Sequence, residues 1–239
     1  MQDLSNIPAK RGIVLTDFHA FRMIYHMQNI HEIRHPLVQH HLVQLRDKRT
    51  SPEAFRHIVH RLSILVSYEA CKDLEIQSVE VETPLGMAQG GQLRQRIALV
   101  PILRAGLGMV DPVLNLIPGA QVWHLGFYRD EKTHKPVEYY KKRPHSDPVD
   151  IAMVLDPMLA TGGSAVAALK AVYDWGAKEV RLLAMIAAPE GIRKVHEKFP
   201  DTHIYVCAID EGLNENAFIV PGLGDAGDRI FNAQPEVDT

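Results

Sequence analysis

One segment constrains the fold of this 239-residue chain more than any other: residues 154–164, which read VLDPMLATGGS. An apolar run ends on the carboxylate of Asp156, a loop of small and hydroxyl residues follows, and an Ala-rich helical sequence begins at Gly163. Strands that alternate with helices in this way build a parallel α/β sheet. The segment therefore predicts an α/β protein in which this loop lies at the carboxyl end of a strand, where such sheets bind ligands.

The same alternation continues on both sides of this segment. Apolar runs predict strands over residues 97–102, 122–128, 151–155, 180–187 and 204–209, and an alternating run predicts a half-exposed strand over residues 79–83. Helices are predicted over residues 36–49, 113–117, 163–175 and 192–199, and Ser51-Pro52-Glu53 begins another that extends to about Leu74. Residues 86–96 fit a hairpin or a loop. Because no linker is visible, we expect an N-terminal extension over residues 1–30, with an amphipathic piece at 17–27, and one domain over residues 31–239.

The composition excludes several classes of protein. An apolar fraction of 46%, a charged fraction of 23% and a net charge of −3 are ordinary for a globular protein and argue against nucleic-acid binding. Cys71 and Cys207 are too few for a disulfide framework, which fits a reducing compartment. The first residues lack a signal-peptide core, and no window reaches the roughly 18 apolar residues of a membrane span. We therefore expect a cytoplasmic protein without a membrane or nucleic-acid partner.

Thirteen histidines, eight of them before residue 61, raise the question of a metal site or a pH switch. His57 and His60 could share one helix face, but no nearby acid or cysteine completes a ligand set. We interpret these histidines as solvated or interface residues.

The loop over residues 156–164 has the character of a phosphate cradle. At the start of a helix, backbone N–H groups lack partners and the helix dipole favours an anion. Gly162 and Gly163 let the backbone approach that anion, and Thr161 and Ser164 add hydroxyl donors. The loop lacks the lysine of a Walker motif, so it is not a P-loop.

Two further segments carry cationic side chains. Arg104 follows the strand expected at residues 97–102, where it could grip a phosphate or form a structural salt bridge, and the sequence favours neither. Arg129 and Lys132 open a polar segment that runs to Pro148, which we interpret as a lid, the alternative being a solvated loop. Together with the phosphate cradle, these cations predict a polyanionic substrate.

Residues 221–228 (PGLGDAGD) contain the glycine spacing of a dinucleotide-binding fingerprint. That interpretation fails because too few residues follow for the helix, second strand and ribose-binding acid of the motif. A glycine-rich loop with two carboxylates, Asp225 and Asp228, instead predicts close backbone contact with a small ligand.

These segments resemble the uracil phosphoribosyltransferase family. The matching stretches are residues 100–109 (VPILRAGLGM), 156–164 (DPMLATGGS), 187–192 (AAPEGI), 209–214 (IDEGLN) and 221–228 (PGLGDAGD), and the resemblance covers about residues 35–231. It implies an α/β, type I phosphoribosyltransferase fold: a central parallel sheet flanked by helices, with a small hood. It also implies UMP salvage from uracil and 5-phospho-α-D-ribose 1-diphosphate (PRPP), with Mg²⁺ bound mainly through the diphosphate.

The resemblance assigns site residues at matching positions. Asp156, Arg104 and Asp225 are expected to be catalytic. The PRPP site is expected to comprise Arg104, Arg129, Asp156, Pro157, Met158, Leu159, Ala160, Thr161, Gly162, Gly163, Ser164 and Asp225. The uracil site is expected to comprise Ile219, Gly224, Asp225 and Ala226. Many phosphoribosyltransferases have two adjacent acids at the start of the phosphate loop, whereas Pro157 follows Asp156 here, as in the uracil branch, so no protein metal ligand is expected.

Two other functions compete with the enzyme. A pyrimidine regulator on the same fold would bind RNA through a basic face, but the chain is acidic and its cluster at residues 141–143 is short. An inactive homologue would act as a binding module, which the intact DPMLATGGS and GLGDAGD motifs argue against. The apolar faces of the early helices and the resemblance imply a homodimer or homotetramer. The resemblance leaves open activation by GTP, which occurs in part of the family.

Overall fold

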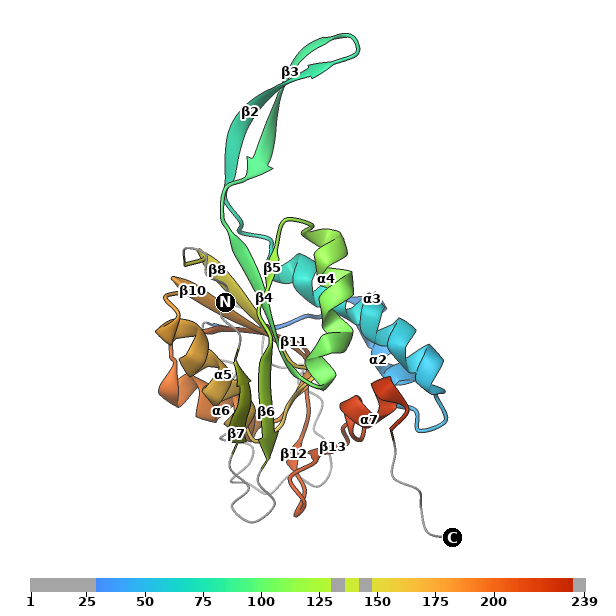
Figure 1. Cartoon of the computed structure of the whole chain (residues 1–239). Coiled ribbons are helices and arrows are strands. Elements are labelled where there is room, and N and C mark those ends of the chain that lie inside the picture. The colour runs from blue at the N-terminus through green and yellow to red at the C-terminus, as the bar shows by residue number, and fades with distance from the viewer. Residues whose placement is uncertain (1–28, 130–135, 142–147, 234–239) are drawn as a thin grey trace, which may run out of the picture.

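The computed structural model describes residues 29–129, 136–141 and 148–233, and a nine-stranded sheet runs through them (Figure 1). Its strands are β1 Ile30–Glu32, β4 Ile97–Leu103, β5 Gln121–Val122, β6 Leu125–Arg129, β7 Pro136–Lys141, β8 Ile151–Leu155, β9 Met158–Leu159, β10 Glu179–Ala187 and β11 His203–Ile209. The main path of the sheet is β1-β11-β10-β8-β4-β6-β7, with β5 beside β4 and β9 beside β10. Neighbouring strands run parallel, except that β7 is antiparallel to β6.

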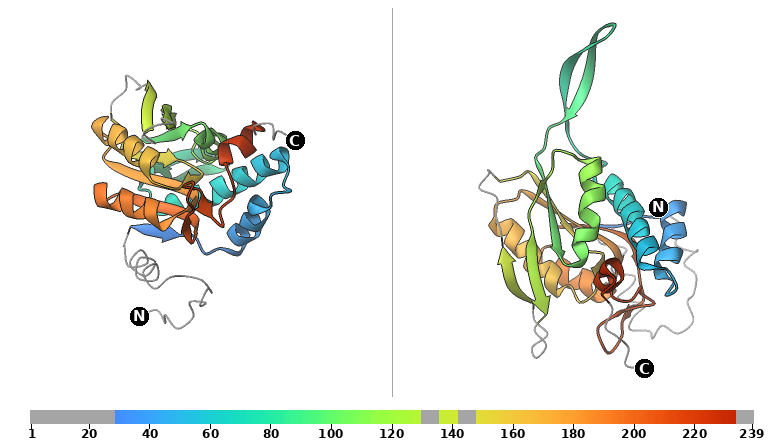
Figure 2. Two further views of the ribbon diagram at one scale, coloured as in Figure 1. Left: turned by 90° about the horizontal axis from the view of Figure 1, so that it is seen from below. Right: turned by 45° about the vertical axis from the view of Figure 1, so that its right-hand side comes forward.

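Helices cover both faces of this sheet (Figures 1 and 2). They are α2 Pro36–Arg46, α3 Pro52–Ala70, α4 Val110–Leu116, α5 Gly163–Asp174, α6 Pro189–Lys198 and α7 Ala226–Phe231, with a 3₁₀ turn at Ala105–Met109 before α4. Alternate residues of β8 face two different cores. Ile151, Met153 and Leu155 pack with α2, α3, α4 and α7, whereas Ala152 and Val154 pack with α5 and α6. This period of two explains why the strand reads as a continuous apolar run.

The central strands and the long helices predicted from the sequence are confirmed, although some of their ends differ. Ser51 begins α3 as expected, because its hydroxyl accepts a hydrogen bond from the Ala54 N–H at 3.3 Å. α2 ends at Arg46 rather than at residue 49, and α3 ends at Ala70. The strand predicted at residues 122–128 is divided into β5 and β6, which pair with successive parts of β4.

Two segments interpreted as loops contain regular structure. The polar stretch over residues 129–148 holds strand β7, so the prediction of one long lid loop is wrong. Val137 and Tyr139 favour a strand, but the charges around them concealed this signal. Residues 221–228 also do not form a loop throughout, because α7 begins at Ala226.

A hairpin of β2 Ile76–Thr83 and β3 Gly86–Leu93, hereafter the arm, projects from the body of the molecule (Figures 1 and 2). The sequence predicted a half-exposed strand here, but most residues of the arm are exposed. A second small sheet pairs β12 Gly212–Leu213 with β13 Ile219–Val220. It lies at the carboxyl side of β11, close to α6.

No helix in the described ranges is long and apolar enough to cross a membrane. The amphipathic piece predicted at residues 17–27 and the predicted lid residue Lys132 lie outside the described residues.

Candidate active site

The carboxyl ends of the parallel strands β4, β8 and β11 meet at one edge of the sheet. Arg104 directly follows β4, Asp156 follows β8 and Asp210 follows β11. The sheet thereby brings together charged residues that are up to 106 positions apart in the sequence. This is the edge at which open α/β sheets bind ligands, as the sequence predicted for Asp156.

The phosphate loop, residues 156–164, joins this edge to helix α5. Gly162 is the N-cap of α5 with a φ of 73°, and no side chain caps the helix there. The Gly163 N–H donates only a long bond of 3.5 Å to the hydroxyl of Thr161. A Cβ on Gly162 would lie 2.9 Å from the carbonyl oxygen of Gly191, because α6 packs directly behind the loop. The result is a tight turn with helix N–H groups available to an anion.

Asp156 is half-buried at the start of the phosphate loop, and its Oδ1 accepts the Met158 N–H at 3.4 Å. Burial raises the pKa of its carboxyl to about 7, and the negative charge of Asp225 raises this pKa further, against the effect of the Met158 hydrogen bond. Asp225 therefore lies near enough to repel Asp156. A cation placed beside Asp156 would favour its ionised form.

Arg104 follows β4, the strand paired with β8, and forms an ion pair. Its Nη2 donates to Oδ1 of Asp228 at 2.9 Å, which is the salt bridge that the sequence left open. The Arg104 side chain is nevertheless 58% exposed. An anionic ligand can therefore still approach the guanidinium, and a grip on phosphate stays a prediction.

Residues 219–226 carry the predicted uracil site and form a bend between β13 and α7, hereafter the glycine loop. Gly222 and Gly224 have φ values of 63° and 78°, in the left-handed region that glycine tolerates best. Asp225 caps α7 by accepting the Asp228 N–H at 2.9 Å. The side chains of Ile219 and Ala226 are buried, whereas Gly224 and Asp225 are exposed.

Arg129 is the last residue of β6, and its side chain lies outside what the structure describes. The histidines do not form a metal centre with other ligands in the described part of the chain, where no group of three His, Cys, Asp or Glu residues could hold an ion. His31 instead stacks on Tyr205, with ring centroids 4.4 Å apart, and lies in hydrogen-bonding contact with His203 at 3.0 Å. These rings lie on the edge strand β1 and its neighbour β11, whereas Asp156 follows β8, which β10 separates from β11.

Comparison with known proteins decides the family. Residues 32–233 match the family model described as uracil phosphoribosyltransferase. The chain belongs to the uracil phosphoribosyltransferase family. The family predicted from the motifs is thus confirmed, and so is the fold of a central, mostly parallel sheet flanked by helices.

Relatives within this family are similar over most of their length. The uracil phosphoribosyltransferase of Roseiflexus sp. (strain RS-1) is 56% identical over 198 residues, which are 83% of this chain and 95% of that protein. The uracil phosphoribosyltransferase of Staphylococcus aureus (strain Newman) is 48% identical over 209 residues, covering 87% of this chain and all of that one. A solved structure of an Aquifex aeolicus protein is 39% identical and superposes with a TM-score of 0.82 over 86% of this chain and 99% of that one.

Sequence analysis missed three residues whose hydrogen bonds hold the main chain of the glycine loop: Arg46, Asp210 and Arg229. Arg46 is the last residue of α2, where a cation is an ordinary partner of the helix dipole. Asp210 belongs to the IDEGLN motif, which was noted without a role, and Arg229 follows the PGLGDAGD motif. Their partners are 164 or more positions away or are backbone groups, so no local pattern reveals them.

Proposed function

We propose that the chain transfers the 5-phosphoribosyl group of PRPP to uracil, forming UMP and diphosphate. The observation that carries this proposal is the closeness of the phosphate loop and the glycine loop: the negative charge of Asp225 in one raises the pKa of Asp156 in the other. The names of the relatives support uracil as the acceptor. The bond from C1′ of the ribose to diphosphate breaks, and C1′ bonds to N1 of uracil as N1 loses its proton.

PRPP would bind across the phosphate loop. The 5′-phosphate fits at the N-terminus of α5, where Gly162, Gly163 and Ser164 offer donors and the helix dipole favours an anion. Residues 156–161 would border the ribose. Arg104, together with Arg129 as the resemblance implies, would hold the diphosphate, and each charge-assisted hydrogen bond contributes about 1.5–3 kcal/mol.

Asp156 has the chemistry to support the cationic centre of the reaction. Departure of diphosphate leaves positive charge on the ribose ring, and a carboxylate beside it lowers the barrier electrostatically. A nearby cation also shifts Asp156 toward its ionised form, opposing the burial and the repulsion from Asp225 that raise its pKa. Arg104 would stabilise the charge that develops on the leaving diphosphate.

Mg²⁺ fits this site as a partner of the diphosphate. Asp156 and Asp225 carry hard oxygen atoms, which suit Mg²⁺ and its bound water, but they do not form part of a three-residue metal cluster among the described residues. When bound, the ion would neutralise diphosphate oxygens and so ease their departure. Because no direct protein ligand is expected, the two carboxylates would act on the ion through its bound water.

Uracil would bind along the glycine loop. No described residue forms a hydrogen bond with the main chain of Gly224, so its N–H and C=O can face a base. Uracil presents acceptor, donor and acceptor groups along one edge, which backbone groups of Gly224, Asp225 and Ala226 can match, with Ile219 behind them. Cytosine replaces one acceptor by a donor and would leave a buried group unpaired, a difference worth up to about 10⁴-fold.

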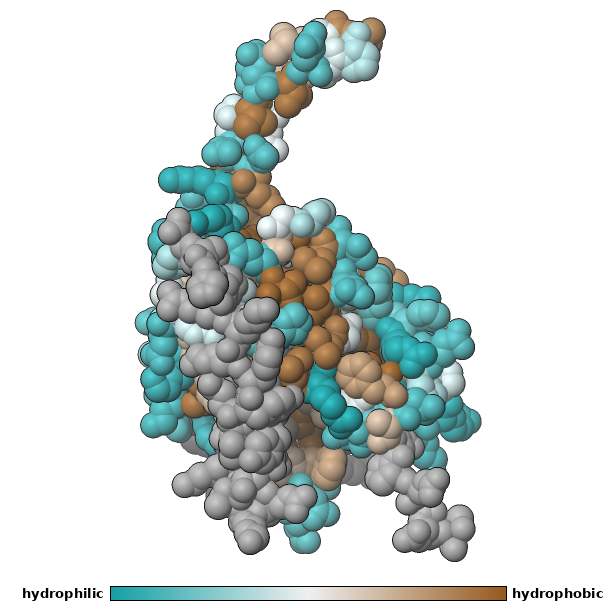
Figure 3. All heavy atoms as spheres, in the orientation of Figure 1, coloured by the Kyte–Doolittle hydropathy of each residue, from teal (hydrophilic) through white to brown (hydrophobic). Residues whose placement is uncertain are grey.

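The arm supports an assembly of several copies. Ile76, Leu85 and Met87 are 69%, 99% and 61% exposed, and Figure 3 shows hydrophobic residues along the arm and on the body beside it. An isolated two-stranded hairpin is marginally stable in water, and exposed apolar surface commonly marks a protein contact. We propose that a second copy covers the arm in a homodimer or homotetramer. A monomeric mass by light scattering would contradict this.

The decisive experiment measures UMP formation from uracil and PRPP, with and without Mg²⁺, and with cytosine, orotate and hypoxanthine as competitors. Mg²⁺-dependent turnover of uracil alone is expected. Absence of turnover in a chain that still binds PRPP would refute the proposal and favour a regulatory role. Activation by GTP, a cytoplasmic location and the division into residues 1–30 and 31–239 stay predictions.

A further inference from the structure

An ion pair behind the glycine loop holds the main chain of Gly222 at both of its polar atoms. Asp210, whose side chain is only 4% exposed, accepts the Gly222 N–H at 2.9 Å. Arg46 donates to the Gly222 carbonyl at 2.8 Å and to the two oxygens of Asp210 at 2.7 and 2.6 Å. Arg46 ends α2, Asp210 directly follows β11, and Gly222 lies in the glycine loop.

A second arginine connects the same two regions. Arg229, which is buried, donates to the carbonyl of Leu223 at 2.7 Å and to the carbonyls of Leu45 and Asp47 at 2.8 and 2.7 Å. Its guanidinium also lies over the ring of Phe55, 4.2 Å from the centroid. The C-terminal end of α2 is thus fastened to the glycine loop at two consecutive residues, 222 and 223.

These contacts determine where the base-reading part of the loop begins. The N–H and C=O of Gly222 and the C=O of Leu223 all form hydrogen bonds. These bonds fix the position and direction of the backbone at Gly224. A Cβ on Gly222 would collide with the carbonyl oxygen of Ile219, so only glycine fits this tight turn. The three-group edge of uracil tolerates little displacement of the backbone groups that pair with it, because hydrogen bonds weaken steeply when misaligned.

We propose that Arg46 and Asp210 are positioning residues for uracil: they touch no substrate, and they set uracil affinity through the placement of Gly222. This inference rests on the proposed function. It concerns uracil more than PRPP, because the phosphate loop depends on α5 and α6 and shares neither residue, and Asp225 is the one residue of the glycine loop that is also expected at the PRPP site. Disturbing the pair should therefore weaken uracil binding much more than PRPP binding.

Two mild variants test this positioning role. Arg46→Lys keeps the positive charge at the end of α2 but cannot bridge both Asp210 oxygens and the Gly222 carbonyl in one plane. Asp210→Asn keeps the size of the side chain and an acceptor for the Gly222 N–H but removes the charge. We expect each variant to raise the KM for uracil at least tenfold, with the KM for PRPP and the kcat at saturating uracil within about threefold of the unaltered chain.

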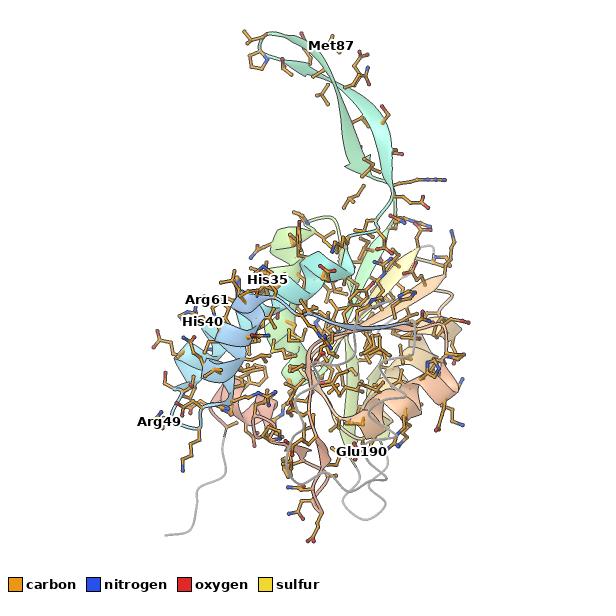
Figure 4. The ribbon with its side chains drawn as sticks, turned by 180° about the vertical axis from the view of Figure 1, so that it is seen from behind. His35, His40, Arg49, Arg61, Met87 and Glu190 are labelled. Carbon is orange, nitrogen blue, oxygen red and sulfur yellow. The ribbon has the colours of Figure 1, made fainter. Side chains whose placement is uncertain are left out.

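The matched control is Arg49→Lys, the same change three residues further on. Arg49 pairs with Asp47 on the surface, its side chain is 84% exposed, and Figure 4 shows it beyond the end of α2. Its kinetic constants should not change. Arg46→Ala provides a second test, since added methylguanidinium should lower the raised KM for uracil by refilling the vacated position.

A readout independent of catalysis separates this inference from the proposed function. Amide hydrogen exchange in residues 222–226 should accelerate at least fivefold in Arg46→Lys, while exchange in residues 162–166 stays unchanged. Unchanged exchange, an unchanged KM for uracil, or an equal rise in both KM values would overturn the positioning role. If the unaltered chain makes no UMP but Arg46→Lys still shows the exchange effect, only the proposed function is refuted.

Discussion

Replacing Asp156 by Asn should abolish activity and at the same time stabilise the ligand-free protein at alkaline pH. The pKa of Asp156 is about 7 in the folded protein, mainly because of burial, against an ordinary value of 3.8. The folded state therefore binds this proton more tightly than the unfolded state does. Stability from the protonated carboxyl is complete below pH 3.8 and is lost as the pH rises to about 7.

The size of the effect follows from the difference between the two pKa values. One pKa unit corresponds to about 1.4 kcal/mol, so the full change is about 4 kcal/mol. Because Asp156 is only half-buried, solvent screening reduces the expected value to about 2 kcal/mol. The range from pH 5 to pH 7 covers about two of these three pKa units, so about two thirds of the change falls between pH 5 and pH 8. Asn cannot ionise, so Asp156→Asn should gain about 1 kcal/mol relative to the unaltered chain between pH 5 and pH 8.

Urea unfolding of both proteins at pH 5 and pH 8 measures the difference, and UMP formation measures the loss of activity. Asp201→Asn, an exposed acid on a turn, is the control and should show no such pH-dependent gain. A stability difference between Asp156→Asn and the unaltered chain that is the same at both pH values would refute the raised pKa. Retained turnover would refute the catalytic role.

Three further predictions follow from individual contacts. Gly162→Ala should cost about 1–2 kcal/mol of stability from the left-handed backbone alone. It should also raise the KM for PRPP, because the added Cβ would press on Gly191. Urea unfolding and steady-state kinetics measure the two effects, and unchanged values would contradict the tight turn. Arg104→Gln should lower kcat/KM for PRPP about 100-fold, because the guanidinium would stabilise the leaving diphosphate. A loss of stability without a kinetic effect would mean that Arg104 serves only the salt bridge with Asp228. Burial, and then His203, lower the pKa of His31, so its contribution to stability is present above pH 6.5 and is lost as the pH falls below it. His31→Phe should therefore be less sensitive to acid between pH 7 and pH 5 in thermal unfolding, and equal sensitivity would count against the buried neutral ring.

The phosphate loop was predictable because its signals are local. The apolar run before Asp156, the small residues after it and the Ala-rich helix all lie within about 20 positions, and each has a direct physical meaning. The structure places the glycine cap, the helix start and the carboxylate as that pattern indicated. The order of the strands and the approach of Asp225 to Asp156 could not be inferred from this local pattern.

Strand β7 and helix α7 were missed for a different reason. Both are short, of six residues each, and both lie in stretches whose charges or glycines favour a loop by composition. Short elements gain little from intrinsic propensity and are stabilised by their neighbours. Pairing with β6 stabilises one of them, and packing of the other against α3 and the 3₁₀ turn buries its Ile230.

The sequence alone determined the class of fold, the position of the phosphate loop and, through its motifs, the family. These depend on periodicity and on short runs of residues, which act over one strand or one helix turn. Only the tertiary structure decided that Arg104 pairs with Asp228, that burial and Asp225 perturb Asp156, and that Arg46 and Asp210 hold Gly222. Those properties depend on distances between residues far apart in the chain, and such distances exist only once the sheet has brought the ends of its strands together.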